Sequence, residues 1–323
     1  MKNRVYLKDL AEKLNLSANT VSRALHDKDD ISEKTKEEVR RVAGELGYVP
    51  DMVASSLRTS STKTVAVLFD NLVNPYFILM ANQVNGELAR WNYRMMIFTT
   101  TGSEAILTMD VFRQMIGHRV DGVVSFLRPT PEVAQFSRTL HLPIIVVGRE
   151  ADDLGIDCVF TDDFHGGYVM GEYLYANGHR NIGYLGGPKD IMCNVKRAQG
   201  LEKFLEEKGL RPLVLYALWD DSSLLRNIDR FIEDNVDAIF CFNDSIAYSA
   251  ILYIRERYSR HKATEITGYD NIASQLRLPI SLASVGTDVQ KMVRICVDRL
   301  MDRIRRFDVL PFVACMPTFL VEK

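Results

Sequence analysis

A short run of polar side chains near the N-terminus has the chemistry needed to read DNA. Asn19 can pair with adenine through two hydrogen bonds, and Arg23 can pair with guanine in the same way. The methyl group of Ala18 could contact a thymine methyl group. Three neighbouring hydroxyl side chains are available to phosphates: Ser17, Thr20 and Ser22. A helix that presents these residues could enter a major groove.

Two short helices would position these side chains. The first is predicted from apolar residues at helical spacing, which are Leu7, Leu10, Ala11 and Leu14. Asn15 can adopt the left-handed conformation that a tight turn needs, and Ser17 offers an N-cap oxygen to the second helix. That second helix packs inward through Val21 and Leu25. The pattern predicts a helix-turn-helix.

Bulk charge alone does not support DNA binding. Residues 1–60 contain eleven Lys or Arg and ten Asp or Glu, which gives a net charge of +1. The interpretation therefore depends on arrangement, with acids facing away and four basic residues facing phosphates: Lys2, Arg4, Arg23 and Arg58. The alternative is that Asn19 and Arg23 are only the solvated face of a small helix, a reading that the whole motif disfavours.

Length and composition are those of a multidomain globular protein. A chain of 323 residues is too long for one ordinary core, so two or three domains are expected. The five cysteines are scattered without paired spacing, which indicates reduced thiols in a cytosolic protein. No apolar run approaches the roughly 20 residues of a membrane helix. We therefore expect a cytoplasmic protein with no membrane partner.

No catalytic, cofactor or metal site is predicted. The Gly-Gly-Pro run at 186–188 lacks the Lys-Ser/Thr of a phosphate-binding loop. His165 and His179 have no partners at metal-ligand spacing. Asp162 and Asp163 are adjacent in sequence and are not placed across a cleft.

The remainder of the chain alternates short apolar runs with helical patterns. Such continuous β-rich runs predict parallel strands that are buried on both faces. Candidate strands are 65–69, 94–99, 122–126, 143–148, 181–185, 213–218, 238–242, 265–269 and material within 312–321. Candidate helices are 76–92, 103–117, 131–140, 164–177, 196–208, 222–235, 245–258 and 287–306. Two doubly wound α/β lobes fit this count, with a ligand cleft where their strand C-termini meet.

The whole chain resembles the lactose/galactose repressor (LacI) family. The resemblance rests on several motifs: Leu7-x-Asp9-Leu10-Ala11, Thr20-Val21-Ser22-Arg23, Leu46-Gly47-Tyr48-x-Pro50, Arg119-Val120-Asp121-Gly122, Asn243-Asp244 and Gly268-Tyr269-Asp270-Asn271. It implies a periplasmic-binding-protein-like core behind an all-α head. It also implies a homodimer that binds a pseudo-palindromic operator and changes its affinity when a small molecule closes the cleft. Tyr6 and Asn15 depart from the family's usual Thr and Gly, which puts the phosphate contact at Tyr6 in doubt.

The resemblance further implies a hinge helix at 51–58 that orders on DNA. Leu57 would wedge a central base step in the minor groove, with Arg58 beside it at the phosphates. The alternative is that Leu57 packs against its own core.

By the same resemblance, polar residues at strand ends bind the effector. The matching positions are Asp70, Asn71, Asn74, Arg197, Asn243, Asp244 and Asp270. Carboxylate, amide and guanidinium groups suit a polyhydroxylated ligand, because each can form paired hydrogen bonds to vicinal hydroxyls. Trp219 and Phe77 could stack on a sugar ring, and Phe126 and Asp162 are weaker candidates. The alternative is that such residues only cap helices, as Asp244 would before the 245–258 helix.

We therefore expect a transcriptional regulator, most simply a repressor of carbohydrate-use genes. Its domains would be a DNA-binding head at 1–50, a hinge and linker at 51–63, and a sensing and dimerising core at 64–323. The core lobes would be about 64–162 with 284–306, and 163–283 with 307–323. The alternative function is a cytoplasmic sugar-binding protein or sugar-modifying enzyme with a non-functional head.

Overall fold

The computed structural model describes residues 5–49, 61–70, 72–100, 106–218, 221–258 and 264–322. Contacts within the chain define two units, Met1–Thr62 and Lys63–Lys323. The expected hinge helix at 51–58 lies outside the described residues.

The first unit contains three helices among its described residues. They are α1 Leu7–Leu14, α2 Ala18–Leu25 and α3 Glu33–Leu46. Their shared core is built on Leu10, Ala11, Val21, Ala24, Val39 and Ala43. Ser17 and Ser32 cap α2 and α3, and their hydroxyl oxygens accept the N–H groups of Thr20 and Thr35. The predicted helix-turn-helix is confirmed.

The two departures from the usual head sequence are both compatible with the turn and cap. Asn15 ends α1 with φ 52° and ψ 42°, the left-handed conformation that was predicted for it. At the other end, the N–H of Tyr6 donates to the carboxylate of Asp9 at 2.7 Å. The side chain three residues into α1 thus satisfies the backbone group that precedes the helix.

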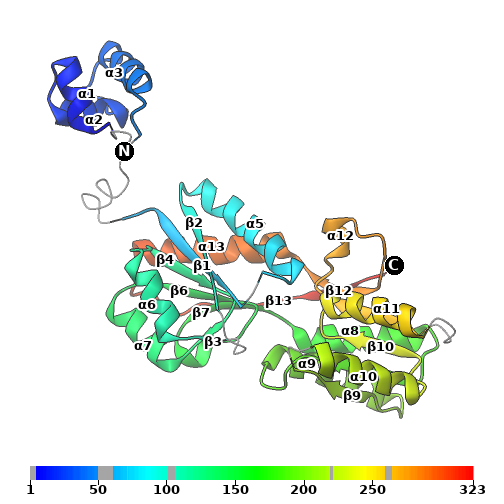
Figure 1. Ribbon diagram of the computed structural model, residues 1–323. Coiled ribbons are helices and arrows are strands. Elements are labelled where there is room, and N and C mark those ends of the chain that lie inside the picture. The colour runs from blue at the N-terminus through cyan, green and yellow to red at the C-terminus, as the bar shows by residue number, and fades with distance from the viewer. Residues whose placement is uncertain are drawn as a thin grey trace. The chain divides into compact units, whose positions relative to one another are not determined.

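The first lobe of the core is a six-stranded parallel sheet in the order β13-β7-β6-β4-β1-β2. Its strands are β1 Thr64–Phe69, β2 Arg94–Thr99, β4 Gly122–Ser125, β6 Ile144–Val147, β7 Asp157–Thr161 and β13 Val313–Met316. Helices α5 Pro75–Arg90 and α13 Val289–Arg305 pack on one face, and α6 Met109–Gly117 and α7 Pro131–Thr139 pack on the other (Figure 1). A pair of two-residue strands, β3 Ile106–Leu107 and β5 Arg128–Pro129, and a 3-10 turn at Asp152–Leu154 complete the lobe.

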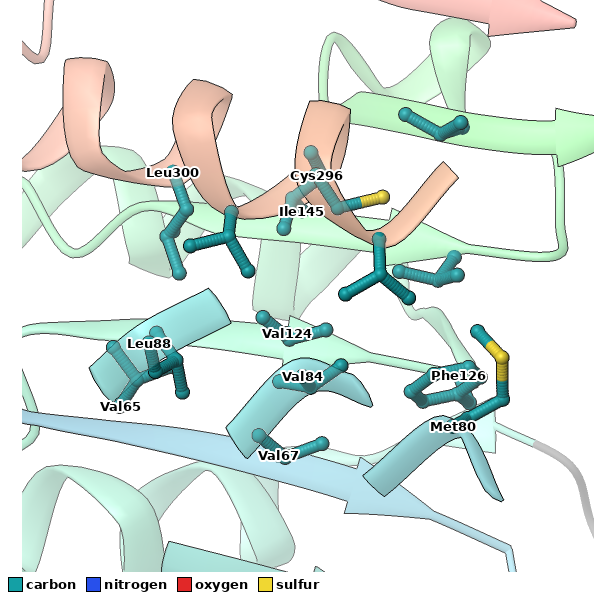
Figure 2. Packing of buried hydrophobic residues seen from close by; sticks show 14 of the residues in the cluster. Val65, Val67, Met80, Val84, Leu88, Val124, Phe126, Ile145, Cys296 and Leu300 are labelled. Carbon is teal, nitrogen blue, oxygen red and sulfur yellow. The ribbon is translucent and has the colours of Figure 1, made fainter. Parts of the chain in front are cut away.

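Alternation along β1 divides its side chains between the two faces. Val65 and Val67 point toward α5 and α13, where they meet Val84 and Leu300 (Figure 2). Ala66 and Leu68 belong to the opposite cluster. Every residue of β1 is buried, as expected for a central parallel strand.

The second lobe repeats this arrangement in the order β14-β12-β11-β10-β8-β9. Its strands are β8 Ile182–Gly186, β9 Leu213–Tyr216, β10 Ala238–Cys241, β11 Glu265–Tyr269, β12 Ser284–Thr287 and the antiparallel edge strand β14 Thr318–Val321. Helices α8 Asp163–Ala176 and α9 Met192–Glu207 cover one face. Helices α10 Asp221–Glu233 and α11 Asp244–Arg257 cover the other, and a short α12 Ala273–Leu276 follows β11.

The lobe boundaries differ from those predicted near the C-terminus. The chain crosses between sheets at Asp162, as expected, but then at Asp288 and Pro317. The prediction that 284–306 belongs to the first lobe and 307–323 to the second is therefore wrong for β12 and β13. The four-residue β12 carries no periodic signal of its own, and Pro317 splits the apolar run 312–321 into two strands because proline has no N–H for a sheet ladder.

Among the described residues, no helix is both long and apolar enough to cross a membrane. The same residues contain no cluster of three or more His, Cys, Asp or Glu side chains that could hold a metal ion.

Candidate DNA-binding helix and effector cavity

Helix α2 presents the side chains that were predicted to read bases. Ala18 and Asn19 are exposed, and Thr20 is half-buried. The Oγ atom of Ser17 accepts the N–H of Thr20 at 3.0 Å and so occupies the N-terminal end of the helix. Both the base-reading interpretation and the solvated-face alternative are consistent with this exposure.

Arg23 is held by Asp30. Its Nε donates to Oδ2 at 2.9 Å, and Nη2 lies 2.6 Å from Oδ1. The hydrogen bond from Arg23 lowers the pKa of Asp30. The side chains are 42% and 56% exposed, and ion pairs in such positions contribute little free energy. Arg23 can therefore exchange Asp30 for a base at small cost.

Ser22 does not belong to the exposed face. It is 6% exposed, and the expectation that its hydroxyl is available to a phosphate stays a prediction. Ser22 lies three residues before Leu25 and so shares the inward side of α2. Leu57 and Arg58 lie outside the described residues.

The core contains a cavity of about 450 Å³ at the C-terminal ends of strands from both lobes. Its wall includes residues that follow β1, β4, β6, β8, β10 and β11, which are Asp70, Phe126, Gly148, Gly187, Phe242 and Asp270. The cavity lies where the sequence predicted the ligand site, because parallel strands from both lobes direct their carboxyl ends toward it.

Most of the predicted effector residues contribute to this wall. Those that do are Asp70, Asn74, Phe77, Phe126, Arg197, Asn243 and Asp270. Asp162 and Asp244 do not line the cavity. Asn71 and Trp219 lie outside the described residues.

Arg197 is a buried cation with fixed geometry. Its Nε donates to Asp163 at 2.8 Å, and its Nη1 donates to the backbone carbonyl of Phe242 at 2.6 Å. The guanidinium carbon lies over the ring of Tyr269, 3.4 Å from the centroid. Within the described residues Nη2 has no hydrogen-bond acceptor, so this nitrogen remains to donate to a ligand.

Close approach of α8 and α9 sets the position of Arg197. A Cβ atom on Gly167 would lie 2.0 Å from the carbonyl oxygen of Arg197, and one on Gly200 would lie 1.9 Å from that of Phe164. The two helices can approach this closely only because both positions lack side chains. The glycines thus bring Arg197 within reach of Asp163 on α8.

Asp270 supplies a hydrogen-bond acceptor to the cavity in which Arg197 is a donor. Its carboxylate accepts no hydrogen bond within the described residues and belongs to the cavity wall. Desolvation raises the pKa of Asp270, and the charge of Arg197 opposes that shift. The backbone adopts φ 102° here, a region that residues other than glycine rarely visit. Such strain is usually retained where it serves a site.

Asn74 and Asn243 have two roles. Each caps a helix through its side-chain oxygen, which accepts the N–H of Tyr76 at 3.1 Å and of Ile246 at 2.9 Å, respectively. Each also lines the cavity. The capping alternative is therefore correct for both residues and does not remove them from the wall.

Aromatic side chains form the apolar part of the cavity. On the first lobe, Phe77 and Phe126 lie edge to face, with ring centroids 5.8 Å apart. Phe126 also stacks on the buried Phe69 at 4.6 Å. On the second lobe, Phe242 and Tyr269 flank Arg197. A ligand ring can thus be held between apolar surfaces while its edge meets polar groups.

Some wall residues were not predicted. Arg149 donates from Nε to the carbonyl of Phe126 at 2.8 Å and lines the cavity. It directly follows the predicted strand 143–148, so the strand-end rule could have found it. Ser245 and Tyr269 also line the cavity. The ring of Tyr269 contributes to the site by contacting the guanidinium of Arg197, which comes from α9. No local sequence pattern predicts this contact.

Asp162 and Asp244 have structural partners in place of the predicted ligand. Asp162 caps α8 by accepting the N–H of His165 at 2.9 Å. Asp244 is buried behind the wall and bonds to Ser284 and to the N–H of Ile272. Strand-end position alone could not separate them from Asp70 or Asp270, because the direction of a side chain depends on the following turn.

Family models match almost the whole chain. Residues 62–305 match the periplasmic binding proteins and sugar binding domain of the LacI family. Residues 6–51 match the bacterial regulatory proteins of the lacI family. The chain belongs to the LacI family. A LacI-family member is a DNA-binding transcriptional regulator and not an enzyme, so the enzyme alternative is excluded.

Relatives that this LacI-family chain matches over most of their length are transcriptional repressors. The HTH-type transcriptional repressor PurR of Aliivibrio salmonicida is 27% identical over 307 residues, which cover 93% of this chain and 92% of PurR. The ribose operon repressor of Haemophilus influenzae is 27% identical over 305 residues, with the same coverage of 93% and 92%. The Lac repressor dimer bound to operator and the anti-inducer ONPF has a TM-score of 0.81 at 22% identity, covering 99% of this chain and 98% of that chain. The predicted fold class is confirmed.

Proposed function

We propose that this regulator is a cytoplasmic homodimeric repressor whose affinity for a pseudo-palindromic operator is controlled by an uncharged, polyhydroxylated effector, most simply a sugar. The observation that carries the proposal is that Arg197 and Asp270 both line one cavity that also has aromatic walls. One group donates and the other accepts, so together they can bind hydroxyl groups that do both.

The charge of the cavity supports a neutral ligand. The two arginines of the wall, Arg149 and Arg197, are balanced by Asp70 in the wall and by Asp163, which lies 2.8 Å from Arg197. A phosphoryl group carries about −1.5 to −2 at neutral pH and would meet these carboxylates without an excess of cations. A phosphorylated effector is therefore disfavoured.

The size of the cavity also fits a small ligand. Its volume of about 450 Å³ falls in the range of roughly 300–1,000 Å³ that is typical of small-molecule sites. The name of one relative, the ribose operon repressor, supports a carbohydrate. Ligand-controlled repression is further supported by the combination of two features in one chain. These are a helix-turn-helix head with an exposed Asn19 and a core with this cavity.

The proposal is tested by calorimetric titration of the full chain. The probes are D-ribose, D-glucose, D-galactose and cellobiose, each compared with its phosphorylated form where one exists. We expect at least one neutral sugar to bind and its phosphate ester to bind more weakly. Tighter binding of the ester than of the neutral sugar would contradict the charge argument.

Two variants locate the binding in the cavity. Asp270→Asn should weaken sugar binding, because the substituted amide retains only one of the two acceptor oxygens. Asp110→Asn is the matched control, since Asp110 is an exposed residue in the first turn of α6, away from the cavity. Equal sugar affinity in the two variants would overturn the assignment of the site.

A further inference from the structure

Asp244 is a buried carboxylate that forms hydrogen bonds to the turn after β11 and does not line the cavity. Its side chain is fully buried at the start of α11. Oδ1 accepts the hydroxyl of Ser284 at 2.7 Å, and Oδ2 accepts the N–H of Ile272 at 2.8 Å. Both partners lie in segments that follow or neighbour β11, the strand that leads into Asp270.

The same two bonds reach the residue next to Asp270. The Oγ of Ser284 accepts the N–H of Asn271 at 3.0 Å while its own hydroxyl donates to Asp244. Asp244 thus binds the N–H of Ile272 directly and that of Asn271 through Ser284. These are the two peptide groups that immediately follow Asp270.

This turn needs such support because its backbone is strained. Asp270 has φ 102° and Asn271 has φ 51°, so two successive non-glycine residues lie at positive φ. Conformations of this kind persist only where the surroundings fix them. A carboxylate that accepts two hydrogen bonds in a desolvated place is a strong restraint.

The space for Asp244 depends on Gly268. A Cβ atom on Gly268 would lie 2.1 Å from Oδ1 of Asp244. Any side chain at 268 would therefore displace the carboxylate from Ser284.

We propose that Asp244 is a positioning residue for the effector site: with Ser284 it fixes the turn at 270–272, so that the carboxylate of Asp270 faces the cavity. The part that concerns ligand affinity rests on the function proposed above, and the part that concerns the turn does not. Asp244 itself does not line the cavity, although its neighbour Asn243 does, so its proposed effect on the effector is indirect.

Amide hydrogen exchange of the ligand-free full chain tests the turn directly. In Asp244→Asn, the amides of Asn271 and Ile272 should exchange roughly tenfold faster or more, because a bond to a charged acceptor is replaced by a weaker one. Amides of β8 and β10 should keep their protection. Asp244→Ala should show a larger effect than Asp244→Asn. Unchanged exchange at Asn271 and Ile272 would overturn the proposal.

Two further variants make the test specific. Gly268→Ala should reproduce the faster exchange of the Asn271 and Ile272 amides while leaving the residue at 244 unchanged. It therefore tests the role of the Asp244 carboxylate even if Asp244→Ala does not fold. Asp229→Asn is the control, because Asp229 also accepts two hydrogen bonds in this lobe, from Tyr253 at 2.8 Å and Tyr258 at 2.7 Å. That variant should leave Asn271 and Ile272 protected.

Sugar titration of the same variants separates the two proposals. Asp244→Asn should have a lower affinity for the sugar that binds the unaltered chain. Asp229→Asn should bind that sugar with unchanged affinity. If no sugar binds the unaltered chain, the proposed function fails while the exchange result still decides the role of Asp244. If Asp244→Asn loses protection yet binds sugar normally, the positioning role is wrong.

Discussion

At the scale of single residues, burial gives Asp244 an unusual proton affinity. Desolvation raises the pKa of Asp244 to about 6, and its hydrogen bonds with Ser284 and Ile272 only partly oppose this. In the unfolded chain the group would titrate near its ordinary value of about 3.9. Between these two values the folded core therefore binds a proton that the unfolded chain does not.

This proton uptake makes the stability of the folded core increase as the pH falls from 6 toward 4. Lowering the pH from 6 toward 4 should stabilise the unaltered core relative to Asp244→Asn, by at most about 1.4 kcal/mol per pH unit. Urea unfolding of both proteins at a series of pH values measures the difference in free energy of unfolding. A difference that is flat, or that grows in the opposite direction, would show that Asp244 does not carry the raised pKa.

Arg197 should be needed for folding as well as for effector binding. Arg197→Ala would leave the buried carboxylate of Asp163 without its partner, which should cost about 3–5 kcal/mol of unfolding free energy. Adding Asp163→Asn removes that charge and should restore much of the stability. Sugar affinity should remain lost in the double variant. Recovery of both stability and sugar affinity would mean that Arg197 has only a structural role.

At the scale of elements, the contact between α8 and α9 is the most constrained. Gly200→Ala places a methyl group against a backbone carbonyl, and overpacking of this kind costs about 1–3 kcal/mol or more. Gly86→Ala is the matched control, because that helical position in α5 has nothing within 4 Å of an added Cβ. The control should gain roughly 0.5–1 kcal/mol, since alanine suits a helix better than glycine. Thermal unfolding compares the two, and equal effects would contradict the close packing.

Most elements were predictable because their signals are local. The expected helix 287–306 is α13 Val289–Arg305, and the expected strand 65–69 is β1 Thr64–Phe69. Strand β7 was missed. It begins with Asp157, a buried charge that argues against a strand until its partners are known. Those partners, Arg299 and Arg303, lie on α13 more than a hundred residues later.

The cavity was predictable to the same extent. Asp70 and Asp270 directly follow β1 and β11, and the topology brings the C-terminal ends of these strands to the cavity. Arg197 lies within α9 and was predicted from the family resemblance alone. The difference between Asp270 in the wall and Asp244 behind it depends on the positive φ of the turn at 270–271. No local pattern reports that geometry.

At the scale of the whole core, the lobes are joined by three short crossings. Two of them run directly from a strand into a helix that an aspartate caps: Asp162 at the start of α8 and Asp288 at the start of α13. Their backbone angles are nearly the same, with φ −74° and ψ 80° at Asp162 and φ −73° and ψ 85° at Asp288. Any change in the angle between lobes on effector binding must be absorbed at these crossings and at Pro317.

In the proposed function the head binds one DNA sequence, and the effector in the cavity controls that binding. The most direct test is selection of genomic fragments by the purified full chain at one near-physiological salt concentration, with and without the sugar found by titration. We predict that a pseudo-palindromic sequence is recovered, and that the sugar changes its binding by the unaltered chain but not by Asp270→Asn. Sequence-blind, salt-sensitive binding that no sugar alters would contradict effector-controlled recognition of an operator.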